Sequence, residues 1–179
     1  GILEKIEVRN PGEYFESLCG EIVGQQLSGK AADTIFGRFQ KLFPKKKITP
    51  ESVMKIPDKK IREAGMSWSK VAFIKDLAKK VISRELQFEK LKELSDEVVL
   101  QEVMKVKGVG PWTAEMFLMF TLQREDVFSH GDLGLRKAIK KLYNFKKDPT
   151  KKQIEKIVAR WTPYKTYASR ILWKSLESE

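Results

Sequence analysis

The sequence predicts an all-α fold, a compact two-lobed bundle of helices. Apolar residues recur at helical spacing over most of the chain, and helix-capping residues precede several of these segments. Alternating patterns typical of strands are scarce, with residues 2–9 as the one weak candidate. We therefore expect a single domain over residues 1–179, in which one lobe holds roughly residues 30–130 and the other gathers both termini.

Four segments carry the helical periodicity most clearly. Their apolar positions are Leu27, Ala31, Ile35, Phe39 and Leu42, then Val71, Ile74, Leu77, Ala78 and Val81, then Ile154, Ile157, Val158 and Trp161, and finally Tyr164, Tyr167, Ala168, Ile171 and Leu172. Pro44 ends the first segment, and Pro163 separates the last two. Thr49 and Ser95 have the sequence context of helix N-caps.

Composition and charge restrict the partners of this chain. Of the 179 residues, 41% are apolar and 10% aromatic, which excludes an intrinsically disordered protein. The longest run of large apolar residues, 116–120, is far shorter than the roughly 20 residues of a membrane span, so we expect no membrane association. The net charge of +11 favours a polyanionic partner, most commonly nucleic acid, although a lysine-rich solvated surface would also explain it.

Metal and redox chemistry find little support in the sequence. The one cysteine, Cys19, excludes a disulfide framework, a four-cysteine zinc site and a cysteine-ligated iron–sulfur cluster, and it suits a reducing compartment. The one histidine, His130, cannot build a metal site alone. We expect neither a metal nor a cofactor.

A glycine-rich turn lies between two predicted helices, 98–106 and 111–122. Gly108 and Gly110 allow positive φ and leave backbone N–H groups uncovered, and Pro111 suits a first helical turn. Such a turn at a helix N-terminus can bind an anion, and a DNA phosphate is the natural anion for so basic a chain. An ordinary helix–helix turn that uses glycine for its geometry is the alternative.

Four segments in order resemble one family. Residues 106–114 resemble the hairpin of the helix-hairpin-helix DNA glycosylase superfamily, and residues 126–136 resemble its catalytic loop. Residues 22–32 resemble the segment that enters the minor groove, and residues 161–173 the closing helices of the 3-methyladenine DNA glycosylase II branch. The resemblance covers nearly the whole chain. It implies a helix-hairpin-helix motif, an active site in the cleft between two lobes, and a monomer that acts on double-stranded DNA containing damaged bases.

The implied activity is base excision repair, in which a damaged base is flipped out and its N-glycosidic bond is hydrolysed to leave an abasic site. The reaction builds positive charge on the sugar, which one carboxylate can stabilise while it positions a water. The family pattern places the catalytic aspartate at Asp132, with Asp126 nearby as a fallback. Asp132 also precedes an apolar helix and would suit its N-cap, a role compatible with catalysis. Bifunctional relatives carry a lysine after the hairpin where this chain has Trp112, so we expect no lyase activity.

Further residues would hold the base and the DNA. Trp112 and Trp173 match pocket tryptophans that favour cationic alkylated purines such as 3-methyladenine, and Met116 and Leu133 stand where relatives can carry aromatics. The gap left by the flipped base would be filled by one of three neighbouring residues, Gln26, Leu27 or Ser28, and we prefer Gln26. The expected DNA contacts are Lys107, Gly108, Val109 and Gly110 in the hairpin, with Lys70 and Lys165 as phosphate ligands. Core packing or solvated surface would explain any one tryptophan or lysine of this set.

Two alternatives stay open at this point. The same scaffold could act on oxidised or deaminated bases, or the chain could be a noncatalytic module that uses the hairpin only to bind DNA. A repair enzyme would work in the cytoplasm beside the nucleoid of a prokaryote, or in the nucleus of a eukaryote.

Overall fold

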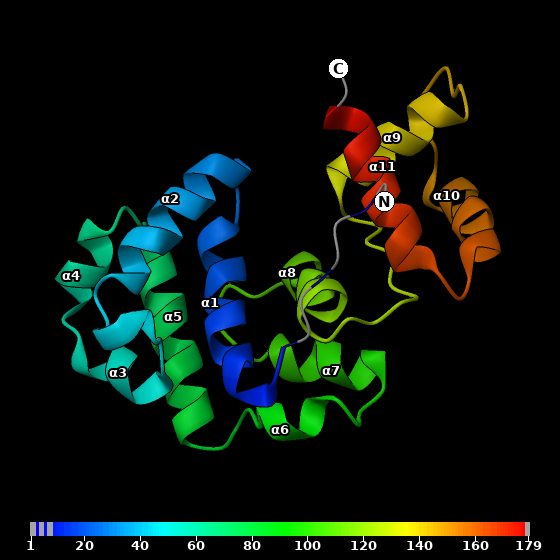
Figure 1. Ribbon diagram of the computed structural model, residues 1–179. Coiled ribbons are helices and arrows are strands. Elements are labelled where there is room, and N and C mark those ends of the chain that lie inside the picture. Colours follow the sequence, from blue (N-terminus) through cyan, green and yellow to red (C-terminus); the bar gives the residue numbers. More distant parts are fainter. Residues whose placement is uncertain (1–2, 4–5, 7–8, 178–179) are drawn as a thin grey trace. The chain divides into compact units, whose positions relative to one another are not determined.

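The computed structural model describes residues 3, 6 and 9–177 (Figure 1). All regular elements in these residues are helices, so the predicted all-α fold is confirmed. The weak strand candidate at 2–9 falls mostly outside the described residues. None of the helices described is long and apolar enough to cross a membrane.

The chain divides into two compact units. The middle unit is Arg9–Phe117, and the C-terminal unit begins at Leu118 and includes Leu3 and Ile6. The middle unit starts about 20 residues earlier than the sequence suggested, because the first helix packs within it. It also ends before residue 130, since Arg124 and Asp126 bond to residues of the last helix, at Thr166 and Lys165.

The middle unit is built around its first helix (Figure 1). Its elements are η1 (Pro11–Glu13), α1 (Tyr14–Gly24), α2 (Gly29–Gln40), η2 (Pro44–Lys46), α3 (Pro50–Lys55), α4 (Asp58–Glu63), α5 (Trp68–Ile82), α6 (Phe88–Leu91), α7 (Asp96–Val103) and α8 (Pro111–Met116). Helix α1 contacts α2, α5 and α8, and its apolar side chains, including Leu18 and Ile22, are fully buried. Tyr14 packs edge-on against Phe117, with ring centroids 5.9 Å apart. This helix therefore holds the unit together.

Apolar periodicity and N-cap residues in the sequence predicted several of these helices. The predicted face of α5 is buried at Val71, Ile74 and Leu77. Thr49 accepts a hydrogen bond from the Ser52 amide and completes a capping box at α3. Ser95 caps α7 by accepting a hydrogen bond from the Val98 amide. These predictions are confirmed.

The predicted apolar face from Leu27 to Leu42 is only partly correct. Helix α2 begins at Gly29 and ends at Gln40, so Leu27 precedes it and is 38% exposed. Phe39 is the one fully buried residue of α2. The periodicity continued past the helix because Leu27 lies in the adjoining turn at a spacing that also fits a helix.

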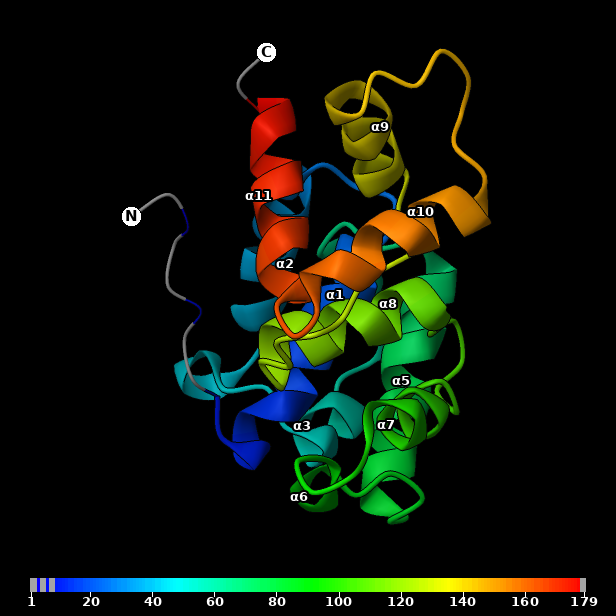
Figure 2. The ribbon, with the colours of Figure 1, turned by 90° about the vertical axis from the view of Figure 1, so that its right-hand side faces the viewer.

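The C-terminal unit has its own core. It contains most of the π-helical η3 (Phe117–Thr121), then α9 (Leu133–Leu142), α10 (Lys151–Val158), η4 (Ala159–Trp161) and α11 (Lys165–Glu177). Helices α9, α10 and α11 are the yellow, orange and red helices of Figure 2. Helices α9 and α11 pack against each other. The core contains Leu135 and Ile139 of α9, Ile154 and Val158 of α10, and Leu172 of α11.

The face predicted for the last helix is wrong for most of its length. Tyr164, Tyr167 and Ile171 are exposed, whereas Thr166, Ser169 and Leu172 face inward. Two of these inward residues are polar, and their hydroxyls bond to backbone carbonyls. Apolar periodicity therefore could not predict the inward face of α11.

The lining of a hollow of about 430 Å³ between α1 and α2 includes three carboxylates, Glu16, Glu21 and Asp33. Burial raises the pKa of Glu21 to about 7, although the positive charge of Arg9 partly opposes this shift. A carboxyl group with a pKa raised by folding holds its proton more tightly in the folded state. Its contribution to stability is therefore lost as the pH rises from about 4.5 to 7.

We expect Glu21→Gln to stabilise the protein at pH 8, by at most about 3 kcal/mol, and to have little effect near pH 4.5. Urea denaturation of both proteins across this pH range measures the difference. Glu63→Gln, at an exposed position of α4, is the matched control. A gain that does not grow with pH would contradict this account of Glu21.

Candidate functional site

The glycine-rich turn joins α7 to α8. Gly108 has a φ of +73°, and a Cβ atom there would collide with the ring of Phe73, so glycine is required. Gly110 instead has an extended backbone, with φ of −97°, and occupies the N-cap of α8 before Pro111. Positive φ is thus confirmed for Gly108 and is wrong for Gly110.

The turn offers fewer free amides than we expected. The Lys107 amide donates to Asp76 of α5 at 2.8 Å, and the Val109 amide donates to the Val106 carbonyl at 3.1 Å. Burial acts to raise the pKa of Asp76, but its hydrogen bonds from the Lys107 amide and the Lys80 side chain outweigh burial and lower it. The Val109 side chain is buried. Lys107 is exposed, so its side chain is the group that this turn presents most fully.

A second turn links α1 to α2. Gln26 has a φ of +57°, and it is exposed together with Leu27 and Ser28. All three candidates for the inserted residue therefore lie on one exposed turn. Gln26 adopts a positive φ, which residues with a side chain rarely do, and the backbone turns sharply at this position.

Two residues fasten this second turn to the rest of the middle unit. The Gln25 side-chain amide donates to the Gly108 carbonyl at 2.9 Å and to the Thr113 hydroxyl at 3.0 Å. The Lys70 ammonium donates to the Val23 and Gln25 carbonyls, both at 2.7 Å. Burial lowers the pKa of Lys70. Lys70 thus anchors the turn, in place of the phosphate contact that we expected. Gln25 anchors it too, although nothing in the sequence around Gln25 indicates this role.

Asp132 lies at the start of α9 and is 8% exposed. Its Oδ1 accepts a hydrogen bond from the Leu135 amide at 2.7 Å, which confirms the N-cap. The same oxygen accepts a hydrogen bond from the indole Nε1 of Trp173, on α11, at 3.0 Å. The structure therefore brings together two predicted site residues that are 41 positions apart.

The surroundings of Asp132 are apolar and aromatic. The Trp173 ring lies against Phe120, with centroids 6.0 Å apart and planes 33° apart. Leu133, the residue after Asp132, is 81% exposed. Within the C-terminal unit, a buried carboxylate thus has an indole and an exposed leucine as neighbours, which suits a site for a flat organic group.

Asp126 and Lys165 pair with each other. The Lys165 ammonium lies 2.8 Å from Asp126 Oδ2, and the Lys165 amide donates to Oδ1 at 3.3 Å. Burial acts to raise the pKa of Asp126, but the hydrogen bonds and the positive charge of Lys165 outweigh burial and lower this pKa. The carboxyl group therefore stays ionised. The pair fastens the start of α11, which argues against Asp126 as the fallback catalyst and against Lys165 as a phosphate ligand.

The predicted residues of α8 differ in exposure. Trp112, in the first turn, is 36% exposed, whereas Met116 is buried in the core. Met116 therefore offers almost no surface to a ligand, and we no longer assign it to a base pocket. Helix periodicity places it one turn from Trp112, but sequence alone did not reveal which side of α8 faces the core.

His130 lies two residues before Asp132 and packs edge-on against Phe128, with centroids 5.0 Å apart. Burial lowers its pKa, and its buried Nδ1 has no hydrogen-bond partner among the described residues. The ring is thus held in its neutral form as part of the loop. Among the described residues, no cluster of three histidines, cysteines or carboxylates forms a metal site.

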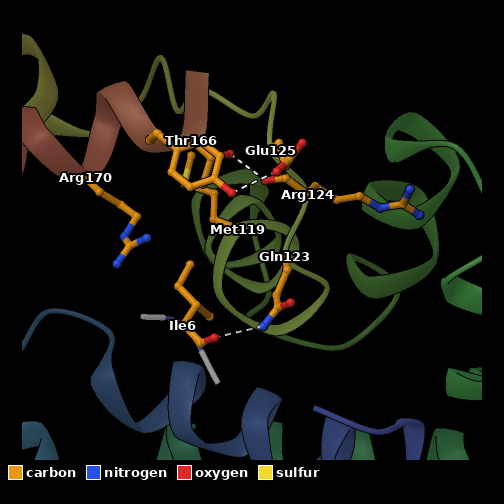
Figure 3. A pocket seen from close by; sticks show the side chains of 8 residues that line it. Ile6, Met119, Gln123, Arg124, Glu125, Thr166 and Arg170 are labelled. Atoms are coloured by element: carbon orange, nitrogen blue, oxygen red, sulfur yellow. Dashed lines mark hydrogen bonds between the residues drawn. The ribbon is translucent and has the colours of Figure 1, made fainter. Parts of the chain in front are cut away.

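A pocket of about 310 Å³ lies elsewhere in the C-terminal unit (Figure 3). Tyr167 donates to Glu125 at 2.8 Å on one side, and the Gln123 amide donates to the Ile6 carbonyl at 3.3 Å on another. Arg170 also lines it. None of the predicted site residues does, so this pocket is separate from the surroundings of Asp132.

The sequence matches a family model described as the HhH-GPD superfamily base excision DNA repair protein over residues 19–164. It is 34% identical over 169 residues to DNA-3-methyladenine glycosylase 1 of Schizosaccharomyces pombe, which covers 91% of this chain and 72% of that protein. It is 31% identical over 162 residues to the putative DNA-3-methyladenine glycosylase YfjP of Bacillus subtilis, covering 87% of this chain and 56% of that one. The chain thus spans little more than half of the second relative.

Solved structures show the same fold. The S. pombe 3-methyladenine DNA glycosylase Mag1, in complex with abasic DNA, matches with a TM-score of 0.89 and 31% identity, over 99% of this chain and 86% of that one. A DNA-3-methyladenine glycosidase from Bacillus halodurans matches with a TM-score of 0.81 and 38% identity, over 97% and 78%.

The bonds of Lys70 lead to a test of the second turn. We expect Lys70→Met to lower the free energy of unfolding by about 1–3 kcal/mol, because two carbonyls at the end of α1 lose a charged donor. Urea denaturation measures the loss, with Lys79→Met, an exposed position of the same helix, as the control. Equal losses in the two variants would show that the ammonium does not anchor the turn.

Proposed function

Since the chain belongs to the HhH-GPD superfamily of base excision DNA repair proteins, we propose that it is a monofunctional DNA glycosylase for alkylated purines such as 3-methyladenine. It flips the damaged base out of the duplex and hydrolyses the N-glycosidic bond, leaving an abasic site. The observation that carries this proposal is the buried carboxylate of Asp132, bonded to the indole of Trp173. Its place of action is the compartment that holds the DNA, the prokaryotic cytoplasm or the eukaryotic nucleus.

Asp132 supplies the chemistry. As the bond to the base breaks, the sugar gains positive charge, and a preoriented carboxylate stabilises that charge without rearranging at the moment of reaction. The same group orients the water that completes hydrolysis. Its bonds to Leu135 and Trp173 hold Oδ1 in place, which supports this role.

Aromatic and apolar side chains receive the base. In the C-terminal unit, the indole of Trp173 attracts a cationic purine through its electron-rich face, and the exposed Leu133 adds apolar contact. Trp112 offers a partly exposed indole of the same kind in the middle unit. An alkylated purine is already a good leaving group, so one carboxylate and an aromatic pocket suffice. Neutral oxidised or deaminated bases would gain less from such a pocket.

The turn between α1 and α2 opens the duplex. Gln26 fills the space of the flipped base, supported by its exposure and its position at the bend of an anchored turn. Leu27 and Ser28 line the same turn, and Lys107 of the hairpin contacts a neighbouring phosphate.

Trp112 separates hydrolysis from lyase chemistry. A bifunctional enzyme needs an amine that attacks the sugar and forms a Schiff base. Here an indole occupies the position after the hairpin where bifunctional relatives carry that lysine, while Lys105 and Lys107 precede the helix. We therefore assign base release without strand cleavage.

The role of Asp132 is tested by Asp132→Asn. We expect release of 3-methyladenine from duplex DNA to fall at least about 100-fold in single-turnover assays, because the amide cannot balance the charge of the sugar. Binding of the duplex in mobility-shift assays should remain. Asp126→Asn is the matched control and should keep base release. Wild-type release by Asp132→Asn would rule out Asp132 as the catalyst.

The absence of lyase activity has its own test. After reaction with a damaged duplex in the presence of borohydride, we expect no covalent protein–DNA adduct, because Trp112 stands at the position where bifunctional relatives carry the lysine that forms the Schiff base. The product strand should break only after treatment with hot alkali. A trapped adduct would show that one of the lysines acts as a nucleophile.

A further inference from the structure

We propose that Trp173 is a positioning residue for Asp132, in addition to its contact with the base, and that Gly134 is glycine so that the two side chains can meet. This inference rests on the proposed function. It assigns the indole N–H a task that base stacking does not require, namely to fix the direction in which the carboxylate faces the sugar.

Two donors from different helices converge on one oxygen. Asp132 Oδ1 accepts from the Leu135 amide of α9 at 2.7 Å and from Trp173 Nε1 of α11 at 3.0 Å. The backbone amide holds this oxygen at the helix end from one direction. The indole N–H approaches it from another helix, and two donors from different directions restrict how the carboxylate plane can turn.

The indole is itself held in place. Its ring lies against Phe120 and packs on the core of the C-terminal unit. The N–H therefore points to Asp132 whether or not a base is bound. A carboxylate oriented in advance stabilises developing charge more effectively than one that must reorient.

Gly134 explains how the indole comes so close. A Cβ atom at this position would stand 3.1 Å from Asp132 Oδ1 and 3.2 Å from Trp173 Cδ1, so one of them would have to move by a few tenths of an ångström. The backbone of Gly134 has no positive φ and lies within α9. Alanine would favour the helix there, so the close approach, and not the backbone, accounts for the glycine.

The test uses two uncleavable duplexes that differ in charge at the sugar. One carries a neutral tetrahydrofuran abasic nucleotide, and the other a protonated pyrrolidine in its place, which mimics the cationic sugar. We expect wild-type protein to prefer the cationic duplex. Trp173→Phe keeps an aromatic ring and loses the N–H, and it should lower this preference about tenfold, whereas a loss of packing alone would weaken both duplexes equally.

Matched variants make the result specific. Trp161→Phe, a half-buried tryptophan that packs on Phe128 in the same unit, should keep the preference. Gly134→Ala should lower it less than Trp173→Phe, and it carries the test if Trp173→Phe does not fold. In the Asp132→Asn background, Trp173→Phe should cause no further loss.

The outcomes separate the two proposals. A wild-type preference in Trp173→Phe, or an equal loss for both duplexes, would overturn the positioning role and leave the proposed function intact. A wild-type preference in Asp132→Asn would show that this carboxylate does not face the sugar, and the proposed function would fail instead.

Discussion

A carboxylate removed from water must be compensated by hydrogen bonds from the fold, and at Asp132 this requirement ties two helices together. The same oxygen ends one helix and accepts the indole N–H of another. Leu135 and Leu172 pack together in the core of this unit, so apolar burial and polar compensation act in the same place. The packing that stabilises the C-terminal unit thereby also orients its one buried carboxylate among the described residues.

Local rules sufficed wherever a few neighbouring residues decide the structure. The N-caps at Thr49, Ser95 and Asp132 and the buried face of α5 follow from spacings of three and four residues. The positive φ of Gly108 belongs to this class as well, although its close approach to Phe73 of α5 does not. The resemblance of four short segments then pointed to the family, and the family-model match agrees.

Partners that are distant in sequence could not be predicted in this way. Lys70 and Lys165 look like surface lysines in the sequence, yet each bonds within the protein. Lys70 donates to carbonyls 45 and 47 positions away, and Lys165 donates to Asp126. Gln25 bonds to residues more than 80 positions away. A long polar side chain carries no local sign of its partner. The polar inward face of α11 was missed for a related reason, because hydroxyls satisfied by backbone carbonyls do not register as hydrophobic.

The amide of Gln25 makes the turn that we expect to enter the duplex and the hairpin that we expect to hold the backbone one mechanical piece. Because these hydrogen bonds join the two turns, the turn with Gln26 cannot move into the duplex independently once the hairpin has bound the DNA backbone. The duplex has to distort instead, and a base pair opens more easily when it is weakly stacked and weakly paired. If this turn enters the duplex as proposed, we expect weakly paired and weakly stacked sites to be selected first, through the deformability of the DNA and before the base is bound.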